Sequence, residues 1–514
     1  MRTRNELRLR VEMSAAFVIG VALVVACGSA PSVARVDRGS PATDAGSAPP
    51  NDASRAPDHE AEPQDAADDA PIDGPHGASD VPAIACADTV AAVYVTPSPL
   101  PAMTLARRGD IVRCARGPEI DLASAATRMQ AAGVIGNVQP TTGVATLRIA
   151  FRTTRSNGAD GVSTALVYLP HTPRVNPAPL VVVAHPTVGL AAACAPSATN
   201  EGLDNLALPF AATGYVVIAP DLAGLGNGGV QGYLDNVDGA RSFLDAARAV
   251  RKLLASDVLA SRYLAVGFSQ GGGVVLSSQA LDRDYGDGQI AGVVAIAAEW
   301  QTRVNSFGFV DMMRAPTDLT ISTGISKCVV QAMRSYAYFV NFKGAGHAGD
   351  AFPVSTRSGM IGAIESQCFI PLGGYVQGVA PYLGQLFDDD FRASFLRCVD
   401  TSGACASAGP GAAAAKGLYD FLVANIVRAD PQGAPVLYVQ GLLDSIMRPD
   451  EEAACNLDKL RADGITPQVC IDGASDHGDA PKRTIAFAMK WGAATLSGVS
   501  PPTCSASGLP ACNP

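Results

Sequence analysis

Large apolar side chains are scarce in one long stretch of this 514-residue chain. Residues 28–80 contain no Phe, Tyr, Trp, Leu or Cys and are crowded with Ala, Pro, Asp and Ser. Such a segment cannot offset the entropy of ordering its backbone, which is roughly 1–2 kcal/mol per residue. This composition excludes a packed core in the stretch and predicts an extended, disordered tether.

Basic residues are in the minority. The chain has 38 Lys and Arg against 48 Asp and Glu, a net charge of −10, and residues 28–80 hold 11 of the acidic residues with only 3 Arg. The rest of the chain is therefore close to balanced and has no basic excess of the kind that binds nucleic acid. We expect no nucleic-acid partner, and the composition leaves the oligomeric state open.

Histidine is scarce, with six in the whole chain. Asp472, Asp476 and Asp479 surround His477, but no second His or Cys stands at ligand spacing there. A zinc site needs several nitrogen or sulfur ligands. We therefore expect no catalytic metal.

The first 27 residues are typical of a targeting segment. Arginines come first, and the apolar run over 13–26 is shorter than the roughly 20 residues of a membrane span, so a cleaved signal peptide is predicted. It ends in Ala26-Cys27-Gly28, which resembles the lipobox of bacterial lipoproteins, whose cysteine becomes the lipidated N-terminus. Cys27 would then anchor the protein outside the cytoplasm, with the outer membrane favoured. The alternative is ordinary secretion with cleavage near Ala30.

The remaining residues, 81–514, suffice for one large domain with insertions or for a core with a cap. Their 11 cysteines fit an oxidising compartment, in agreement with the signal segment. Their odd number leaves at least one thiol free or bonded externally, and spacing alone does not derive the pairing. The bridges that would close short loops are Cys398–Cys405, Cys504–Cys512 and Cys455–Cys470.

Short apolar strands alternate with longer helical patterns in this body, which favours an α/β fold with a mostly parallel sheet flanked by helices. Several strands are continuous Val, Ile and Leu runs, as expected when both faces are buried. An amphipathic helix is predicted over 240–254, with Asp235 or Asn236 as its cap. The expected strands are Leu147–Phe151, Thr164–Leu169, Leu180–Ala184, Tyr215–Ala219, Tyr263–Val266, Val293–Ile296, Val436–Val439 and Gln468–Ile471.

The alternation fails from about residue 302 to residue 430. This stretch is rich in Met, Phe and Tyr and is interrupted by Gly/Pro loops. We interpret it as a helical cap inserted between two core strands. A second domain with its own function is the alternative, and no independent motif supports it.

The sharpest motif is Gly267-Phe268-Ser269-Gln270-Gly271, which directly follows the strand Tyr263–Val266 and precedes a helical run. A serine on a tight turn between a strand and a helix needs small neighbours, because other backbone segments pass close to it. This context is typical of the nucleophile elbow of α/β-hydrolases and makes Ser269 the candidate nucleophile.

A serine hydroxyl needs a base, ordinarily a histidine that a carboxylate orients. In an α/β-hydrolase the base follows the elbow in the chain, which leaves His347 and His477. His347 falls in the expected cap, whereas His477 follows the last strand. Asp444 follows the strand Val436–Val439 and is the candidate acid, and Asp450 is expected to cap the next helix.

The developing oxyanion needs hydrogen-bond donors. One candidate is the backbone N–H of Gln270, and the other is that of Thr187 in the loop after Leu180–Ala184, since Pro186 has no N–H. His185 is expected to shape this loop. We also expect Cys194 to bridge to Cys328 or Cys368 of the cap and so to pin the loop.

Several segments together resemble the secretory lipase family, whose fungal members include a lipase A. They are the elbow through Gly272, His185-Pro186-Thr187 with Cys194-Ala195-Pro196-Ser197, and Ala219-Pro220-Asp221-Leu222-Ala223-Gly224-Leu225-Gly226 with Gly232-Tyr233-Leu234. The resemblance spans about 151–274. It implies an α/β-hydrolase core with a helical cap, lipase or esterase activity without a cofactor, and a triad at Ser269, Asp444 and His477. Pro186 departs from the glycine usual in the family.

The sequence thus predicts an extracytoplasmic serine hydrolase that cleaves carboxylic esters through an acyl-enzyme. A peptidase or a polymer-ester hydrolase on the same fold stays open, because the fold does not determine the leaving group. A catalytically inactive surface-binding homologue is the alternative from a different class.

Overall fold

The computed structural model describes residues 84–504 and 507–512, except for residues 137, 316–320, 381 and 410. The predicted signal segment with Cys27 and the predicted tether lie outside the described residues. In the part of the chain that is described, none of the helices has the length and apolar character needed to cross a membrane.

A nine-stranded sheet forms the centre of the described domain, in the order β1-β2-β3-β5-β4-β6-β7-β8-β9. The strands from β5 to β9 in this order are parallel, and β1, β2 and β3 form an antiparallel extension. All eight expected strands are present. The bounds are β1 Ile111–Arg116, β2 Val144–Thr154, β3 Asp160–Pro170, β4 Ala178–Ala184, β5 Val216–Pro220, β6 Leu259–Phe268, β7 Ile290–Ile296, β8 Val436–Gly441 and β9 Gln468–Asp472.

The strand missed from sequence is β1 at the edge of the sheet. Its sequence Ile-Val-Arg-Cys-Ala-Arg contains two arginines, and its first three residues are only half-buried. An edge strand does not need the continuous apolar run of a central one, and so the hydrophobic pattern did not reveal it.

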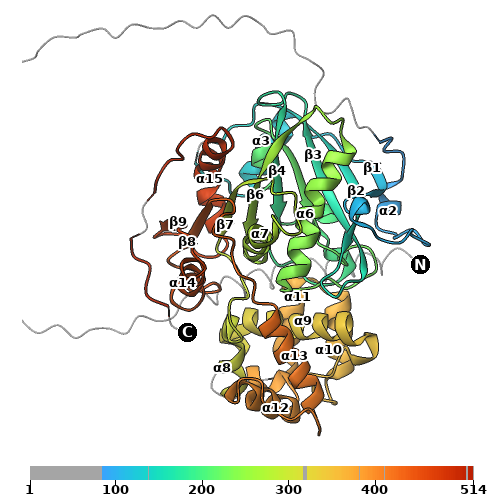
Figure 1. Cartoon of the computed structure of the whole chain (residues 1–514), viewed down its shortest axis with the longest axis vertical. Coiled ribbons are helices and arrows are strands. Elements are labelled where there is room, and N and C mark those ends of the chain that lie inside the picture. The colour runs from blue at the N-terminus through green and yellow to red at the C-terminus, as the bar shows by residue number, and fades with distance from the viewer. Residues whose placement is uncertain are drawn as a thin grey trace, which may run out of the picture. The chain divides into compact units, whose positions relative to one another are not determined.

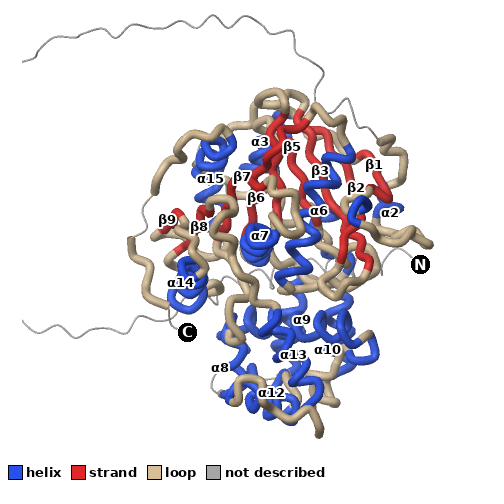
Figure 2. The backbone as a smooth tube through the Cα atoms, in the orientation of Figure 1, coloured by secondary structure: helices blue, strands red, loops and turns tan. Residues whose placement is uncertain are grey.

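Helices cover both faces of the sheet because successive side chains of a strand point to opposite sides. Along β4, Leu180 and Val182 pack on the side of α6, α7 and α14, whereas Val181 and Val183 pack on the side of α3, α5 and α15. Figure 2 shows α6 and α7 lying side by side across the sheet. The helices of the core are α2 Val90–Val93, η2 Leu105–Arg107, α3 Leu122–Ala131, η3 Ala192–Cys194, α4 Pro196–Thr199, α5 Leu208–Ala211, α6 Asn236–Leu253, α7 Gln270–Leu281, η7 Pro449–Ala453, α14 Ala454–Ala462 and α15 Ala480–Leu496.

The longest core helix, α6, begins and packs as the sequence predicts. The side chain of Asp235 accepts hydrogen bonds from the N–H groups of Val237 and Asp238, which satisfies donors that the first turn leaves free. Phe243 and Val250 are fully buried against the sheet.

The helices η4 to α13 lie between β7 and β8 in the chain and form the inserted cap, which Figure 1 shows in yellow and orange beside the sheet. Its interior is aromatic: the ring of Phe309 lies 5.0 Å from that of Phe395, and Phe391 stacks on Phe387 and Phe395. This explains why the pattern of alternating strands fails there. The bounds are η4 Ser306–Gly308, α8 Phe309–Arg314, α9 Ile321–Lys343, η5 Ala345–His347, α10 Arg357–Ser366, α11 Phe369–Val379, η6 Leu383–Leu386, α12 Asp389–Asp400 and α13 Ala412–Ala424.

Two of the expected disulfides are present and two are wrong. Cys398–Cys405 forms, and Cys194 bridges to Cys368, the second of its two candidate partners. Cys455 pairs with Cys512 instead of Cys470, and Cys470 pairs with Cys504 instead of Cys512. The reason is that the C-terminal segment returns along β9, where the Gln468 amide donates to the carbonyl oxygen of Pro502 at 2.7 Å.

The other three described cysteines form one further bridge and leave one free thiol, as their odd number requires. Cys86 and Cys114 form a fifth bridge, which ties the N-terminal end of the described domain to β1. Cys328 is buried in α9 and carries a free thiol.

Candidate active site

Ser269 lies at the turn between β6 and α7. Its backbone has φ 55° and ψ −119°, a conformation that residues other than glycine rarely adopt. The Ser269 N–H donates to the carbonyl oxygen of Ile296 at 2.9 Å, which binds the turn to β7. A strained serine between a parallel strand and a helix is the geometry of a nucleophile elbow.

The glycines of the elbow are required by close packing. A Cβ on Gly271 would collide with the carbonyl oxygen of Ala184 in β4, and a Cβ on Gly267 would collide with that of Gly271. In each case the obstacle is backbone, which cannot rotate away. The motif therefore needs glycine at these two positions because neighbouring backbone segments pass too close for a side chain, as the sequence predicts.

His477 is in the loop between β9 and α15. Its Nε2 is 3.0 Å from Ser269 Oγ, and its Nδ1 is 2.8 Å from Asp444 Oδ2. The imidazole also packs against the ring of Phe268, with centroids 4.9 Å apart. The three residues named from sequence are thus connected in the order serine, histidine, aspartate.

Asp444 follows β8, and its side chain is fully buried. Besides His477, the carboxylate accepts from the N–H groups of Ile446 at 2.9 Å and Met447 at 2.7 Å and from the Gln440 amide at 3.2 Å. Four donors compensate for the loss of water around this carboxylate. Gln440 was not singled out from sequence, because its contact forms only when the chain after β8 turns back.

The other sequence candidates lie elsewhere. His347 is exposed and pairs with Asp350 at 2.8 Å. Asp476 is exposed, and its carboxylate accepts from the Asp479 N–H at 2.9 Å. The expectation that Asp450 caps a helix is wrong: it lies within η7, and its carboxylate pairs with Arg448.

The predicted oxyanion donors are on two elements. Gln270 is the first residue of α7, where N–H groups have no partner within the helix. Thr187 is in the loop after β4, and its hydroxyl is 2.9 Å from the Tyr233 hydroxyl and donates to Glu299 Oε2 at 3.4 Å. The oxyanion role of both N–H groups stays a prediction.

Two features hold the loop that contains Thr187. The buried His185 ring lies between the carbonyl oxygens of Pro186, at 2.6 Å, and Asp221, at 3.1 Å, and its burial lowers its pKa. On the other side of Thr187, the loop is fastened to the start of α11 by the Cys194–Cys368 bridge together with a hydrogen bond of 2.9 Å from Phe369 N–H to the carbonyl oxygen of Val188. His185 therefore shapes the loop.

Glu299 is the chief residue that sequence reasoning missed. It is buried just beyond β7, and burial raises its pKa to about 8, while the positive charge of Arg334 opposes that rise. The signal in the sequence was a carboxylate directly after a buried strand, in Ile296-Ala297-Ala298-Glu299. In an α/β sheet this is the edge where functional side chains gather.

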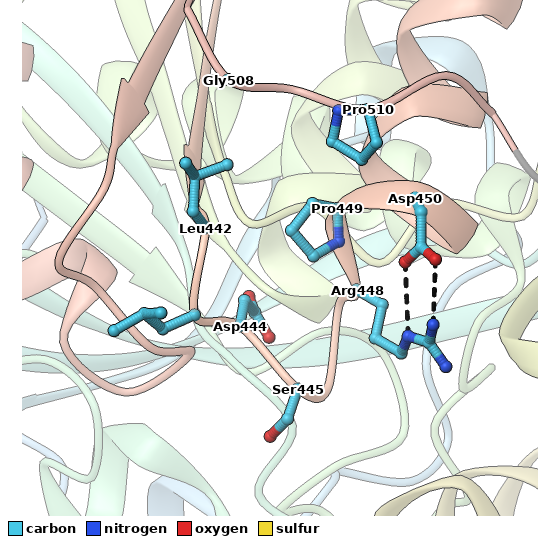
Figure 3. Close-up of a pocket in the computed structure, with 9 residues that line it drawn as sticks. Leu442, Asp444, Ser445, Arg448, Pro449, Asp450, Gly508 and Pro510 are labelled. Atoms are coloured by element: carbon cyan, nitrogen blue, oxygen red, sulfur yellow. Dashed lines mark hydrogen bonds and ion pairs between the residues drawn. The ribbon is translucent and has the colours of Figure 1, made fainter. Parts of the chain in front are cut away.

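A cavity of about 530 Å³ adjoins the loop that contains Asp444 (Figure 3). It lies between residues 442–450 and the C-terminal residues Gly508 and Pro510, and Arg448 and Asp450 pair on its wall. Neither Ser269 nor His477 lines it, so it is not the space in front of the nucleophile. Within the described residues, no group of three or more His, Cys, Asp or Glu could hold a metal ion.

The sheet order, the elbow and the inserted cap define an α/β-hydrolase fold. Among solved structures, the rice cell wall degrading esterase LipA of Xanthomonas oryzae is 19% identical, with a TM-score of 0.57 over 76% of this chain and 97% of that chain. Candida antarctica lipase A in its closed state is 15% identical, with a TM-score of 0.57 over 82% of this chain and 89% of that chain. No protein-family model and no curated protein sequence matches this chain.

Proposed function

We propose that the protein is a serine hydrolase of carboxylic esters, with Ser269 as nucleophile, His477 as general base and Asp444 as the residue that orients the base. The observation that carries this proposal is the hydrogen-bond series from Ser269 Oγ through His477 to Asp444, with distances of 3.0 and 2.8 Å. A strained backbone conformation at a buried serine costs folding free energy, and such strain clusters at active sites. A nucleophilic role of Ser269 accounts for it.

The reaction follows from this geometry. Ser269 Oγ attacks the ester carbonyl while His477 Nε2 takes the hydroxyl proton, and the N–H groups of Thr187 and Gln270 bind the resulting oxyanion. When the tetrahedral intermediate collapses, the bond to the alcohol oxygen breaks and His477 returns the proton to the leaving alcohol. Water, deprotonated by His477, then releases the acid from the acyl-enzyme and restores Ser269.

The proposal places the enzyme outside the cytoplasm. Residues 1–27 act as a lipoprotein signal, Cys27 carries the lipid, and residues 28–80 form the tether of the hydrolase domain at 81–514. The five disulfides support an oxidising compartment.

The ester itself is the open part of the proposal. The resemblance to secretory lipases favours lipid esters. The likeness to a cell wall degrading esterase supports a polymer ester as a second candidate, because fold does not determine the leaving group.

One experiment tests the proposal and distinguishes the two candidate substrates. The purified mature protein is treated with a fluorophosphonate probe and assayed on p-nitrophenyl esters of graded chain length and on plant cell-wall material, with Ser269→Ala as the matched control. We expect labelling and hydrolysis in the wild type and neither in the variant. A wild type that is folded but neither labelled nor active would refute the proposal and favour an inactive binding protein.

A further inference from the structure

Glu299 is a buried carboxyl group that the proposed reaction does not use. Its backbone N–H donates to the carbonyl oxygen of Ser269 at 2.9 Å, so it binds the peptide group that joins Ser269 to Gln270. The N–H of Gln270 belongs to this same peptide group, which the hydrogen bond from Glu299 holds in place. The orientation of that predicted oxyanion donor therefore depends on the backbone of Glu299.

The side chain of Glu299 extends to the other predicted donor. Glu299 Oε2 accepts from the Thr187 hydroxyl at 3.4 Å, and the same hydroxyl oxygen is 2.9 Å from that of Tyr233. A hydroxyl has a single hydrogen. Since Thr187 donates to Glu299, Tyr233 must donate to Thr187, and the three side chains form one directed series.

The surroundings of Glu299 are polar, but some of the buried polar atoms there make no hydrogen bond. Its Oε1 and the Gln270 Oε1 are both buried without a hydrogen-bond partner among the described residues, and both residues line the same small cavity. The charged and titratable groups that act on Glu299 are Arg334 of α9, Glu452 of η7 and Tyr233. A buried polar network is rigid when its groups are paired by hydrogen bonds, and each buried polar group left unpaired costs folding free energy.

We propose that Glu299 is a positioning residue that holds the two oxyanion donors in register, Gln270 through the Ser269 carbonyl and Thr187 through its hydroxyl. Tyr233 completes the hold on Thr187 from the other side. This inference rests on the proposed function. It assigns to Glu299 no contact with substrate and no proton transfer.

The expected effect follows from the demands of the oxyanion site. Donors act only when they lie about 2.7–3.1 Å from the developing charge, and losing one costs roughly 100- to 1,000-fold in kcat. Glu299→Ala and Thr187→Val leave both backbone N–H groups in place but remove the side-chain link. We therefore expect kcat to fall by about 10- to 100-fold, as for a displacement of about 1 Å, with KM within about two-fold of wild type.

The test measures kcat and KM on a p-nitrophenyl ester, with the rate of fluorophosphonate labelling as a second readout. Glu299→Gln should recover most of the kcat lost in Glu299→Ala, because its amide oxygen still accepts from Thr187. The double variant Glu299→Ala/Thr187→Val should be no slower than the slower single variant, since both remove the same link.

Tyr233→Phe removes the outer hydroxyl and should also lower kcat. Its matched control is Tyr168→Phe, which removes a buried hydroxyl that has no partner among the described residues. If Glu299→Ala does not fold by circular dichroism, Thr187→Val and Tyr233→Phe test the same link.

Folded variants with wild-type kcat would overturn the inference, as would a loss confined to KM or an equal loss in Tyr168→Phe. These outcomes all require an active wild type. A wild type without labelling or hydrolysis would refute the proposed function itself and the inference with it.

Discussion

His477 Nδ1 is 2.8 Å from Asp444 Oδ2, although 33 positions separate the two residues and each follows a different strand. They meet because β8 and β9 are parallel neighbours, with Gly441 paired to Asp472 at the ends from which the two loops leave. The carboxylate has no freedom to turn away, since Gln440 and the backbone after it also donate to it. This rigid pairing makes the acid assignment open to a direct test.

The first prediction concerns the proposed triad. Ser269→Ala and His477→Ala should each lower kcat by several orders of magnitude, because the three residues work as a unit. Asp444→Asn should lower it less, since the carboxylate orients the base without transferring the proton. Steady-state kinetics on a p-nitrophenyl ester measure these effects. Asp476→Asn and His347→Ala are the exposed controls and should stay near wild type; an inactive Asp476→Asn beside a fully active Asp444→Asn would transfer the acid role to Asp476.

The second prediction concerns pH and stability. Burial raises the pKa of Asp221 to about 7, of Glu299 to about 8 and of Glu452 to about 7. In the unfolded chain such groups titrate near about 4, so between these limits the folded state binds more protons. The free energy of unfolding therefore falls as pH rises from about 4 to about 8 and levels off above that, and urea unfolding should have a higher midpoint at about pH 5.5 than at about pH 8.5.

The matched control for this prediction is Glu299→Gln, which cannot titrate. It should reduce the difference between the two midpoints without removing it, because Asp221 and Glu452 still contribute. The prediction is wrong if the wild-type midpoint is equal at both pH values or higher at the alkaline one.

The third prediction concerns the C-terminal disulfides. Cys455–Cys512 links residues 57 apart, whereas Cys398–Cys405 links residues 7 apart. In the chain-entropy treatment the longer loop is worth about 4 kcal/mol and the shorter about 2 kcal/mol. Replacing each pair by alanine should therefore lower the free energy of unfolding more for the first pair, as measured by guanidinium unfolding. Peptide mapping without reductant that joins Cys455 to Cys470 would contradict the pairing itself.

The fourth prediction concerns anchoring. Cys27→Ser should release the protein from the membrane fraction or leave its precursor unprocessed, because in bacterial lipoproteins both lipidation and cleavage depend on the cysteine that we propose Cys27 to be. Fractionation and N-terminal sequencing of the mature protein measure this. A soluble wild type whose N-terminus lies beyond Cys27 would favour ordinary secretion.

Most of the core and the three candidate catalytic residues could be predicted from the sequence by itself. Continuous Val, Ile and Leu runs mark strands that are buried on both faces, and the glycines around Ser269 mark a turn where backbones pass close together. Asp444 and His477 followed from their places after strands, because the ends of parallel strands meet at one edge of the sheet. These signals are local, and burial or turn geometry imposes them directly on the residues concerned.

Only the tertiary structure decided the rest. The pairing of Cys470 with Cys504 and of Cys455 with Cys512 depends on the path of the C-terminal segment along β9, which no spacing encodes. The link from Tyr233 through Thr187 to Glu299 joins residues 46 and 112 positions apart, and none of the three belongs to a strand or a helix. Such contacts are set by how loops meet once the sheet has formed, because a loop's backbone is free to adopt many paths until its neighbours pack against it.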